Sequence, residues 1–263
     1  MIEYGEKNGL KAAKPKKERQ KNWRYEEMKN YPKTNKYDQN WLSENSMGPN
    51  PLWLLEDVCE HLDLRPGMKV LDIGCGKGCT SVFLAKEFGV TVFAVCLWID
   101  PTENLRRFEA AGVADKVFPF KAEAHTLPFA NEFFDAAVSV DSYHYYGTCD
   151  RYFPMQFSKL VKPGGQFGIV VPGYSREFVD GHPTLGKFIG AEEFTFHSSP
   201  WWKKHWEKTK IVDIIACYDI EDSHGVWSSG HDKLAWPEFT DADTEKEIAF
   251  VAMAAVKRGL FPL

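Results

Sequence analysis

The chain has 263 residues, of which 44% are hydrophobic and 14% aromatic, and its formal net charge is −5. A soluble chain of this length buries one sizeable core, so we expect one domain with additions. No apolar run approaches the ~18 residues that cross a bilayer, and residues 1–11 lack the apolar centre of a signal peptide. Six irregularly spaced cysteines are typical of reduced thiols in the cytoplasm and argue against a disulfide framework.

The charge is distributed unevenly along the chain. Residues 1–37 carry eleven lysines and arginines against five glutamates, about +6, so the remainder is near −11. An acidic main body argues against a nucleic-acid substrate, although a basic arm that docks a partner or RNA stays an alternative. We therefore expect a disordered or helical arm at 1–37 and one domain at 38–263.

The stretch that follows the arm mixes aromatic residues with turn-forming ones. Asn50 and Pro51 favour a helix start, and 52–62 has helical apolar spacing. We expect this helix to pack on a sheet and the segment before it to lie over the mouth of a ligand site. Trp41 and Met47 are then either core residues or ligand contacts.

Three glycines spaced two apart mark the turn between a strand and a helix. The apolar run 68–73 predicts a buried strand, and 80–88 has a helical pattern. A dinucleotide motif fails because Cys79 stands at its third glycine. A phosphate-binding loop fails because Lys77 is followed by Gly78. The turn nevertheless predicts a polar ligand, since the amides that open a helix are unpaired.

Strands and helices alternate from this turn onward, which predicts a doubly wound, mostly parallel sheet. We expect strands at 69–73, 91–97, 116–120, 135–140 and 165–171, with helices at 79–88, 102–111 and 150–161. A helix at 201–210 and strands at 211–218 and 248–256 complete the domain. Long segments at about 172–200 and 221–247 are predicted to be aromatic lids. Ligands of such sheets bind at the carboxyl ends of the strands.

Asp72 followed by Gly74, Gly76 and Gly78 resembles the first motif of class I S-adenosylmethionine-dependent methyltransferases. The stretch 41–172 looks most like bacterial enzymes related to cyclopropane fatty acid synthases and quinone methyltransferases. The resemblance implies a Rossmann-like seven-stranded sheet with an antiparallel last strand, and S-adenosylmethionine as cofactor. It also implies methyl transfer to an N, O or S atom of a small acceptor. A lipid or quinone acceptor and a non-catalytic cofactor-binding module are the alternatives.

The resemblance also implies which residues bind the cofactor. Glu123 matches the acid that accepts from the adenine amino group, and Leu97 and Trp98 are placed against adenine and ribose. Cys96 stands where the family usually has a ribose-binding acid, so we expect Asp100 or a water to substitute. The full predicted set is Asp72, Gly74, Cys75, Gly76, Gly78, Cys96, Leu97, Trp98, Glu123, Ala124 and Asp141.

Acceptor chemistry is expected where the fourth strand ends. Aromatic side chains there suit a cation, and His144 titrates near neutral pH. We predict His144 as general base with Asp141 behind it, and Tyr143 as a further catalytic residue. The predicted acceptor pocket consists of Trp41, Tyr145, Tyr146, His197 and Trp201.

Cysteines at positions 75, 79 and 96 raise the alternative of a soft-metal site. Because they flank the cofactor side and not the acceptor side, we expect no metal. The sequence leaves the oligomeric state open.

Overall fold

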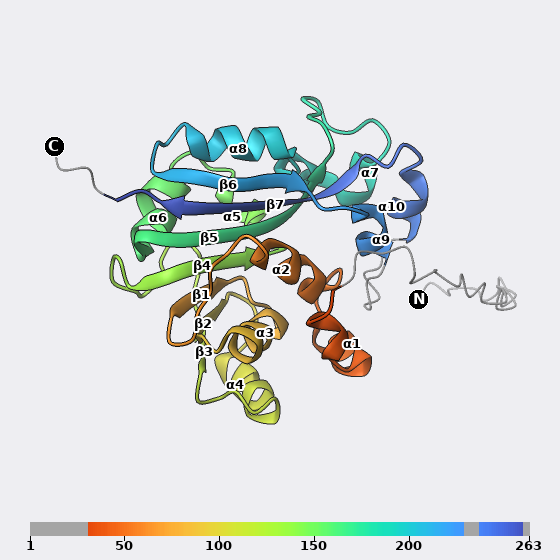
Figure 1. Cartoon of the computed structure of the whole chain (residues 1–263). Helices are drawn as coiled ribbons and strands as arrows, with labels where there is room; N and C mark the ends of the chain where they lie inside the picture. Colours follow the sequence, from red (N-terminus) through yellow and green to blue (C-terminus); the bar gives the residue numbers. More distant parts are fainter. Residues whose placement is uncertain (1–30, 229–236, 260–263) are drawn as a thin grey trace, which may run out of the picture.

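The computed structural model describes residues 31–228 and 237–259, which form an α/β structure around a seven-stranded sheet (Figure 1). The strand order is β3-β2-β1-β4-β5-β7-β6. The first five strands run parallel, whereas β7 is antiparallel to both β5 and β6. The bounds are β1 Lys69–Ile73, β2 Thr91–Cys96, β3 Val117–Lys121, β4 Phe134–Val140, β5 Val161–Tyr174, β6 Val212–Asp219 and β7 Ile248–Lys257. The predicted Rossmann-like sheet is confirmed.

Helices surround the sheet. They are α1 Gln39–Asn45, α2 Pro51–Cys59, α3 Cys79–Phe88, α4 Pro101–Ala110, α5 His144–Gly147, α6 Ser158–Leu160, α7 Gly186–Ile189, α8 Ser199–Glu207, α9 Ser223–Ser228 and α10 Pro237–Ala242. Of these, α2, α3, α4 and α8 differ from predicted helices mainly at their ends, whereas α1, α5, α7, α9 and α10 were not predicted. The helix predicted at 150–161 is instead a π-helical turn, η3 Phe153–Phe157, that runs into α6; Pro154, which lacks an amide hydrogen, stands near its start. Within the described residues, no helix combines the length and apolarity that a bilayer crossing needs.

Alternation along the strands sends side chains to two different cores. Val70 of β1 and Val92 of β2 face the cluster built with α2, α3 and α4. Leu71, the next residue in β1, faces the opposite cluster, which is rich in aromatic residues. There, the ring of Phe153 stacks on Trp206 of α8 with centroids 4.1 Å apart. Both faces of the sheet are therefore covered, which leaves its edges and strand ends for function.

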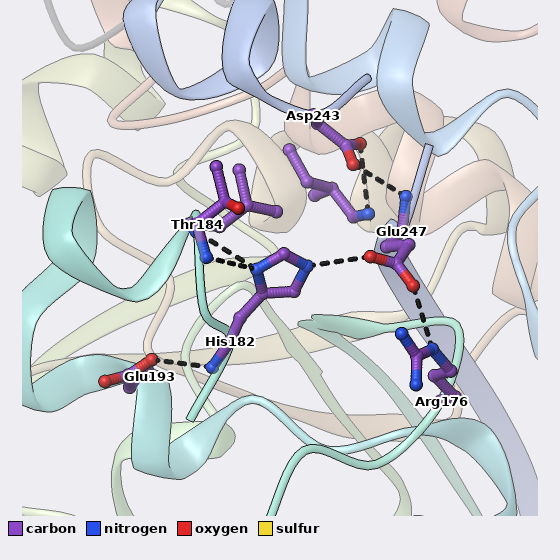
Figure 2. A network of polar contacts seen from close by, with 8 residues as sticks. Arg176, His182, Thr184, Glu193, Asp243 and Glu247 are labelled. Carbon is purple, nitrogen blue, oxygen red and sulfur yellow. Dashed lines mark hydrogen bonds and ion pairs between the residues drawn. The ribbon is translucent and has the colours of Figure 1, made fainter. Parts of the chain in front are cut away.

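The two predicted lid segments meet beyond the end of β5 and the start of β7. Their apolar residues form a separate core of Tyr174, Leu185, Ile189, Phe196, Phe239 and Ile248. Figure 2 shows the polar network beside it, in which the Nε2 of His182 lies 2.9 Å from a carboxylate oxygen of Glu247. Arg176 donates to the other oxygen of Glu247 at 2.8 Å, and Glu193 accepts the amide of His182. These contacts tie 176–193 to the start of β7.

The described end of the predicted basic arm packs on α2. The ring of Tyr31 stacks on Trp53 with centroids 5.7 Å apart, and the amides of Lys33 and Thr34 donate to the buried carboxylate of Glu56. Residues 31–37 are therefore part of the folded body. Residues 1–30 of the predicted arm lie outside the described residues.

Candidate functional site

A cavity of about 240 Å³ lies at the carboxyl ends of β1, β2 and β4. Its walls come from residues 45–49, the glycine turn, the ends of β2 and β3, and the segment after β4. Strand β1 pairs with β2 on one side and with β4 on the other. The strands β2 and β3 are therefore added on one side of β1, and β4 and β5 on the opposite side. Such a reversal leaves a crevice in which open α/β sheets bind ligands.

The glycine turn forms the floor of the cavity and is closely packed. Gly74 and Gly76 have φ values of +80° and +55° and line the cavity. A Cβ at Gly74 would lie 2.0 Å from the hydroxyl of Ser142, and one at Gly76 would lie 3.0 Å from the sulfur of Met47. Gly78, with φ +85°, precedes α3 and lies outside the lining. The turn thus needs glycine both for its backbone angles and for close approach.

Asp72 lies beneath the turn and does not line the cavity. One carboxylate oxygen accepts from the hydroxyls of Thr80 and Ser81, both at 2.6 Å, and the other oxygen has no partner among the described residues. Burial raises the pKa of Asp72 to about 6. We expected it to bond the backbone amides of the turn or the cofactor ammonium. Instead, it holds the start of α3.

Asn104 of α4 is a support for the turn that sequence reasoning missed. Its side-chain amide donates to the carbonyl of Gly76 at 2.9 Å and is itself buried. No local pattern distinguishes this asparagine from others, because the contact spans 28 residues of sequence.

The end of β2 supplies an exposed apolar rim. Cys96, Leu97 and Trp98 line the cavity, and the side chains of Leu97 and Trp98 are 52% and 68% exposed. The sulfur of Cys96 accepts the amide of Ile99 at 3.4 Å. Asp100 caps α4, where it accepts the amide of Thr102, and it is not in the lining. Asp100 is therefore not placed to substitute for a ribose-binding acid.

Glu123 and Ala124 form the wall next to this rim. The carboxylate of Glu123 accepts from the backbone amide of His125 at 2.8 Å and lies 2.6 Å from its Nδ1. These contacts hold the pKa of Glu123 below its usual value. The side chain is 44% exposed, so an ionised carboxylate stays available to a ligand.

The segment after β4 forms the opposite wall. Asp141, Tyr145 and Tyr146 line the cavity. Asp141 has a φ of +51°, and burial together with the charge of Glu192 raises its pKa to about 7. The Tyr145 hydroxyl donates to Glu192 at 3.4 Å, whereas the Tyr146 hydroxyl lies 3.1 Å from that of Ser139.

Tyr143 and His144 lie outside the cavity lining although their neighbours line it. Tyr143 is fully buried among aromatic rings that include Phe157 and Trp202. His144 is 1% exposed, and burial lowers its pKa to about 3. A histidine in this state is neutral at physiological pH.

The other predicted pocket residues, Trp41, His197 and Trp201, also lie outside the lining. Trp41 packs against Tyr37. The ring of His197 stacks on Trp201 with centroids 3.6 Å apart, and its Nδ1 lies 3.0 Å from Glu177. Among the described residues, no part of the predicted lids lines the cavity. Glu192 affects it in two indirect ways: it accepts a hydrogen bond from the Tyr145 hydroxyl, and its charge raises the pKa of Asp141.

Residues 45–49 form a cover over the glycine turn, in the position predicted for this segment. Met47 lies against Gly76, and Gly48 lies so close to Asp141 that a Cβ would come 2.7 Å from its carboxylate. Met47 was expected either here or in the core. The lining residues that were not predicted as site residues are Asn45, Ser46, Gly48, Pro49, Pro51, Ile73, Lys77, Cys79, Thr80, Val95, Ala122, Val140 and Ser142.

The thiols near the glycine turn do not form a metal site together with other metal-binding side chains. Within 31–228 and 237–259, no group of three or more histidine, cysteine, aspartate or glutamate side chains is placed to hold a metal ion. Burial raises the pKa of Cys79 to about 12 and that of Cys75 well above its usual value. Both thiols are therefore protonated at neutral pH.

Comparison with known proteins assigns this chain to a family. The family model for mycolic acid cyclopropane synthetase matches residues 54–194, more than half of the chain. The chain belongs to this family. The predicted relation to class I S-adenosylmethionine-dependent methyltransferases of the cyclopropane synthase branch is thereby confirmed.

Individual relatives agree with this assignment. Methyltransferase GfsG of Streptomyces halstedii is 28% identical over 162 residues, which cover 53% of this chain and 58% of the relative. The cyclopropane-fatty-acyl-phospholipid synthase of Escherichia coli (strain K12) is 30% identical over 138 residues, or 51% of this chain and 34% of the relative. This chain thus spans less than two thirds of either curated relative.

A solved structure shows the same fold. The geranyl diphosphate C-methyltransferase of Streptomyces coelicolor A3(2), in complex with Mg²⁺, geranyl diphosphate and S-adenosyl-L-homocysteine, is 18% identical. It superposes with a TM-score of 0.66 over 77% of this chain and 77% of its own.

Proposed function

We propose that this protein transfers a methyl group from S-adenosylmethionine to a nitrogen, oxygen or sulfur atom of a small organic acceptor. Family membership supports the cofactor and the reaction class. The observation that carries the proposal is the cavity itself, which runs from the glycine turn to Asp141 between an apolar rim and a polar wall. An elongated ligand that is apolar in one part and charged in another matches these neighbouring apolar and polar surfaces.

The residues present fit such a cofactor. The backbone of Gly74 and Gly76 lines the cavity, where it would face the methionyl end. Leu97 and Trp98 offer apolar surface to the adenosine, and Glu123 offers an acceptor to the adenine amine, which only donates. The cavity of about 240 Å³ is smaller than the ~300–1,000 Å³ of typical ligand pockets. We therefore place the adenosine along the exposed rim.

The chain contributes alignment and exclusion of water. When bound, the cofactor would supply an electrophilic methyl group. Residues 45–49 cover the cavity on one side, and Asp141 and Tyr145 bound it on the acceptor side. Positioning of this kind accelerates a two-substrate reaction by restricting the partners to the reactive geometry.

Asp141 is the residue we propose for proton uptake when the acceptor is protonated. Its pKa of about 7 lets the carboxylate hold a proton near neutral pH, and it faces the cavity. His144, the base expected from the sequence, is buried outside the lining with a pKa near 3. A role for His144 or Tyr143 in direct contact with substrate has no geometric support in this conformation.

A lipid or quinone acceptor is the second candidate. It is supported by the family match and by the exposed apolar rim of Met47, Leu97 and Trp98. An apolar tunnel through the tyrosines after β4 would favour it further. However, the space around Tyr143 is filled by the rings of Phe157, Trp202 and Trp206.

A non-catalytic cofactor-binding module would be supported by a blocked pocket. The cavity is open, so this observation does not support that alternative. The basic residues that would dock RNA or a partner fall mostly in 1–30, outside the described residues. All six cysteines are unpaired, which supports our proposal of a reducing compartment, the cytoplasm.

The first test is calorimetric titration with S-adenosylhomocysteine. We expect saturable binding by the wild-type protein and by Asp150→Asn, which removes an exposed carboxylate outside the cavity lining. No heat at millimolar ligand would end the proposal. A screen of amines, thiols, phenols and lipids for production of S-adenosylhomocysteine then identifies the acceptor class.

A further inference from the structure

The carboxylate of Asp141 lines the cavity without a partner from the protein. Among the described residues, no side chain donates a hydrogen bond to it and no lysine or arginine forms an ion pair with it. Its backbone amide is bound to the carbonyl of Val170 at 2.8 Å, which fixes where the side chain starts. Asp141 is only partly exposed, so its carboxylate has lost part of its hydration and gains from a ligand that satisfies it.

The surroundings of Asp141 add further negative potential. Glu192 contributes a second carboxylate, positioned by the hydroxyl of Tyr145 at 3.4 Å, and its charge acts on Asp141. The one basic side chain in the described lining is Lys77, and its ammonium group is bound to the carbonyl of Glu44 at 2.8 Å. The wall after β4 therefore attracts cations and repels anions.

Aromatic surface completes this wall. Tyr145 is 49% exposed and lines the cavity beside Asp141, so its ring is accessible to a ligand. The ring of His144 packs against that of Tyr145 at a tilt of 39°, with centroids 3.9 Å apart, and it is neutral because burial lowers its pKa to about 3. A cation at the ring of Tyr145 thus meets a π face and two carboxylates without a positive charge behind them.

We infer that the acceptor is a small amine that binds as an ammonium ion at Asp141, beside the ring of Tyr145 and in the field of Glu192. The ammonium gives one proton to the Asp141 carboxylate, and the nitrogen lone pair so freed would take the methyl group as S-adenosylhomocysteine leaves. The inference rests on the proposed function and names the substrate class of that site. It separates this chain from one that methylates a neutral lipid chain, because such an acceptor gains nothing from an unpaired carboxylate. The other cation that Asp141 could bind is the ammonium group of the cofactor itself, which the experiment distinguishes.

The experiment measures amine binding to protein saturated with S-adenosylhomocysteine. The probes are small primary, secondary and tertiary alkylamines, each paired with a neutral isostere, for example dimethylaminoethanol with 3-methylbutan-1-ol. We expect at least one amine to bind about tenfold or more tightly than its isostere, since hydrogen bonds to a charged group are worth about 1.5–3 kcal/mol. Calorimetry gives both affinities without relying on turnover.

Asp141→Asn should bring the amine and its isostere to nearly equal affinity while leaving the affinity for S-adenosylhomocysteine within about twofold. Asparagine keeps the shape and tolerates the left-handed φ of +51°, so the fold is preserved. Glu192→Gln should cause a smaller loss of amine affinity, about threefold. Asp150→Asn, with its carboxylate on the exposed surface, is the matched control and should change neither affinity.

Several outcomes would overturn the inference while the proposed function stands. One is that no amine binds at millimolar concentration to protein that binds S-adenosylhomocysteine. Another is that neutral isosteres bind as tightly as the amines. A third is that Asp141→Asn weakens S-adenosylhomocysteine as strongly as the amine, which would assign Asp141 to the cofactor. Failure to bind S-adenosylhomocysteine would instead contradict the proposed function.

Discussion

The cavity after β1 and the segments 172–200 and 221–247 differ in how their side chains are satisfied. The two segments are rich in aromatic and histidine side chains, and these pack on one another, as Phe188 and Phe239 do. Their His182 is satisfied by Glu247 within the protein. At the cavity, in contrast, the lining exposes glycine backbone and an unpaired carboxylate, Asp141. Chemistry is therefore expected where an unpaired carboxylate lines a cavity, and not where aromatic residues are most concentrated.

Gly74→Ala should produce the largest effect, because it adds a Cβ 2.0 Å from the Ser142 hydroxyl at the floor of the cavity. We expect affinity for S-adenosylhomocysteine to fall at least about a hundredfold, or about 2.7 kcal/mol. The matched control is Gly112→Ala, which has a similar φ of +70° but open space around the added atom. If both variants bind S-adenosylhomocysteine as tightly as the wild type, the close approach at position 74 does not matter for binding. Calorimetry with denaturant unfolding separates binding from stability.

Glu247→Ala tests whether the two segments serve stability alone. The substitution removes the partners of His182 and Arg176, which join these segments to β7. We expect a loss of about 2 kcal/mol in the free energy of unfolding, with affinity for S-adenosylhomocysteine within twofold of the wild type. Glu245→Ala, an exposed neighbour, is the control. A large loss of cofactor affinity in folded protein would mean that these segments shape the cavity.

Asp141→Asn should stabilise the ligand-free protein at alkaline pH. The folded-state pKa of about 7 lies above the ordinary value of 3.8, so the native state binds more protons between these values. The contribution of the Asp141 carboxyl to the free energy of unfolding therefore falls as pH rises from about 4 to about 7. The variant has no such carboxyl, so its free energy of unfolding does not fall for this reason. We expect an advantage for the variant of about 1–2 kcal/mol at pH 8 and almost none at pH 4. Urea unfolding at both pH values measures it.

The pH profile also has a clear negative result. Glu192 and Tyr145 face Asp141 and remain in the variant, as does Lys77 across the cavity. Equal stability differences at pH 4 and pH 8 would show that Asp141 titrates normally. The carboxylate would then already be solvated, and its role as a site for a cation would lose its physical basis.

Most of the fold was predictable because its signals are local. The apolar runs that predicted strands at 69–73 and 135–140 coincide with β1 and β4, and the glycine spacing predicted the turn between β1 and α3. Positions directly after strands, such as Leu97 and Asp141, lie at the cavity because parallel strand ends share one edge of a sheet.

Side-chain directions beyond the strand ends were not predictable in the same way. His144 and Tyr145 are adjacent, yet one is buried at the start of α5 and the other is half exposed at the cavity. That choice depends on Phe196 and Glu192, which contact them from about 50 residues away in sequence. The bond from Asn104 to the glycine turn is likewise non-local. Periodicity reports which residues are buried but not which distant partner buries them.

Of the substitutions at Gly74, Glu247, Asp141 and Glu123, Glu123→Gln should have the smallest effect. It tests the cavity wall next to the apolar rim at the end of β2. Glutamine keeps a carbonyl acceptor but loses the charge, so a bond from the adenine amine weakens without being lost. We expect affinity for S-adenosylhomocysteine to fall about three- to tenfold, with Glu109→Gln on the exposed side of α4 unchanged. Because Glu123 also holds His125, the variant needs a second probe, adenosine alone. If the variant loses affinity equally for adenosine and for S-adenosylhomocysteine, Glu123 contacts the adenine end. If only the affinity for S-adenosylhomocysteine falls, adenine binds elsewhere.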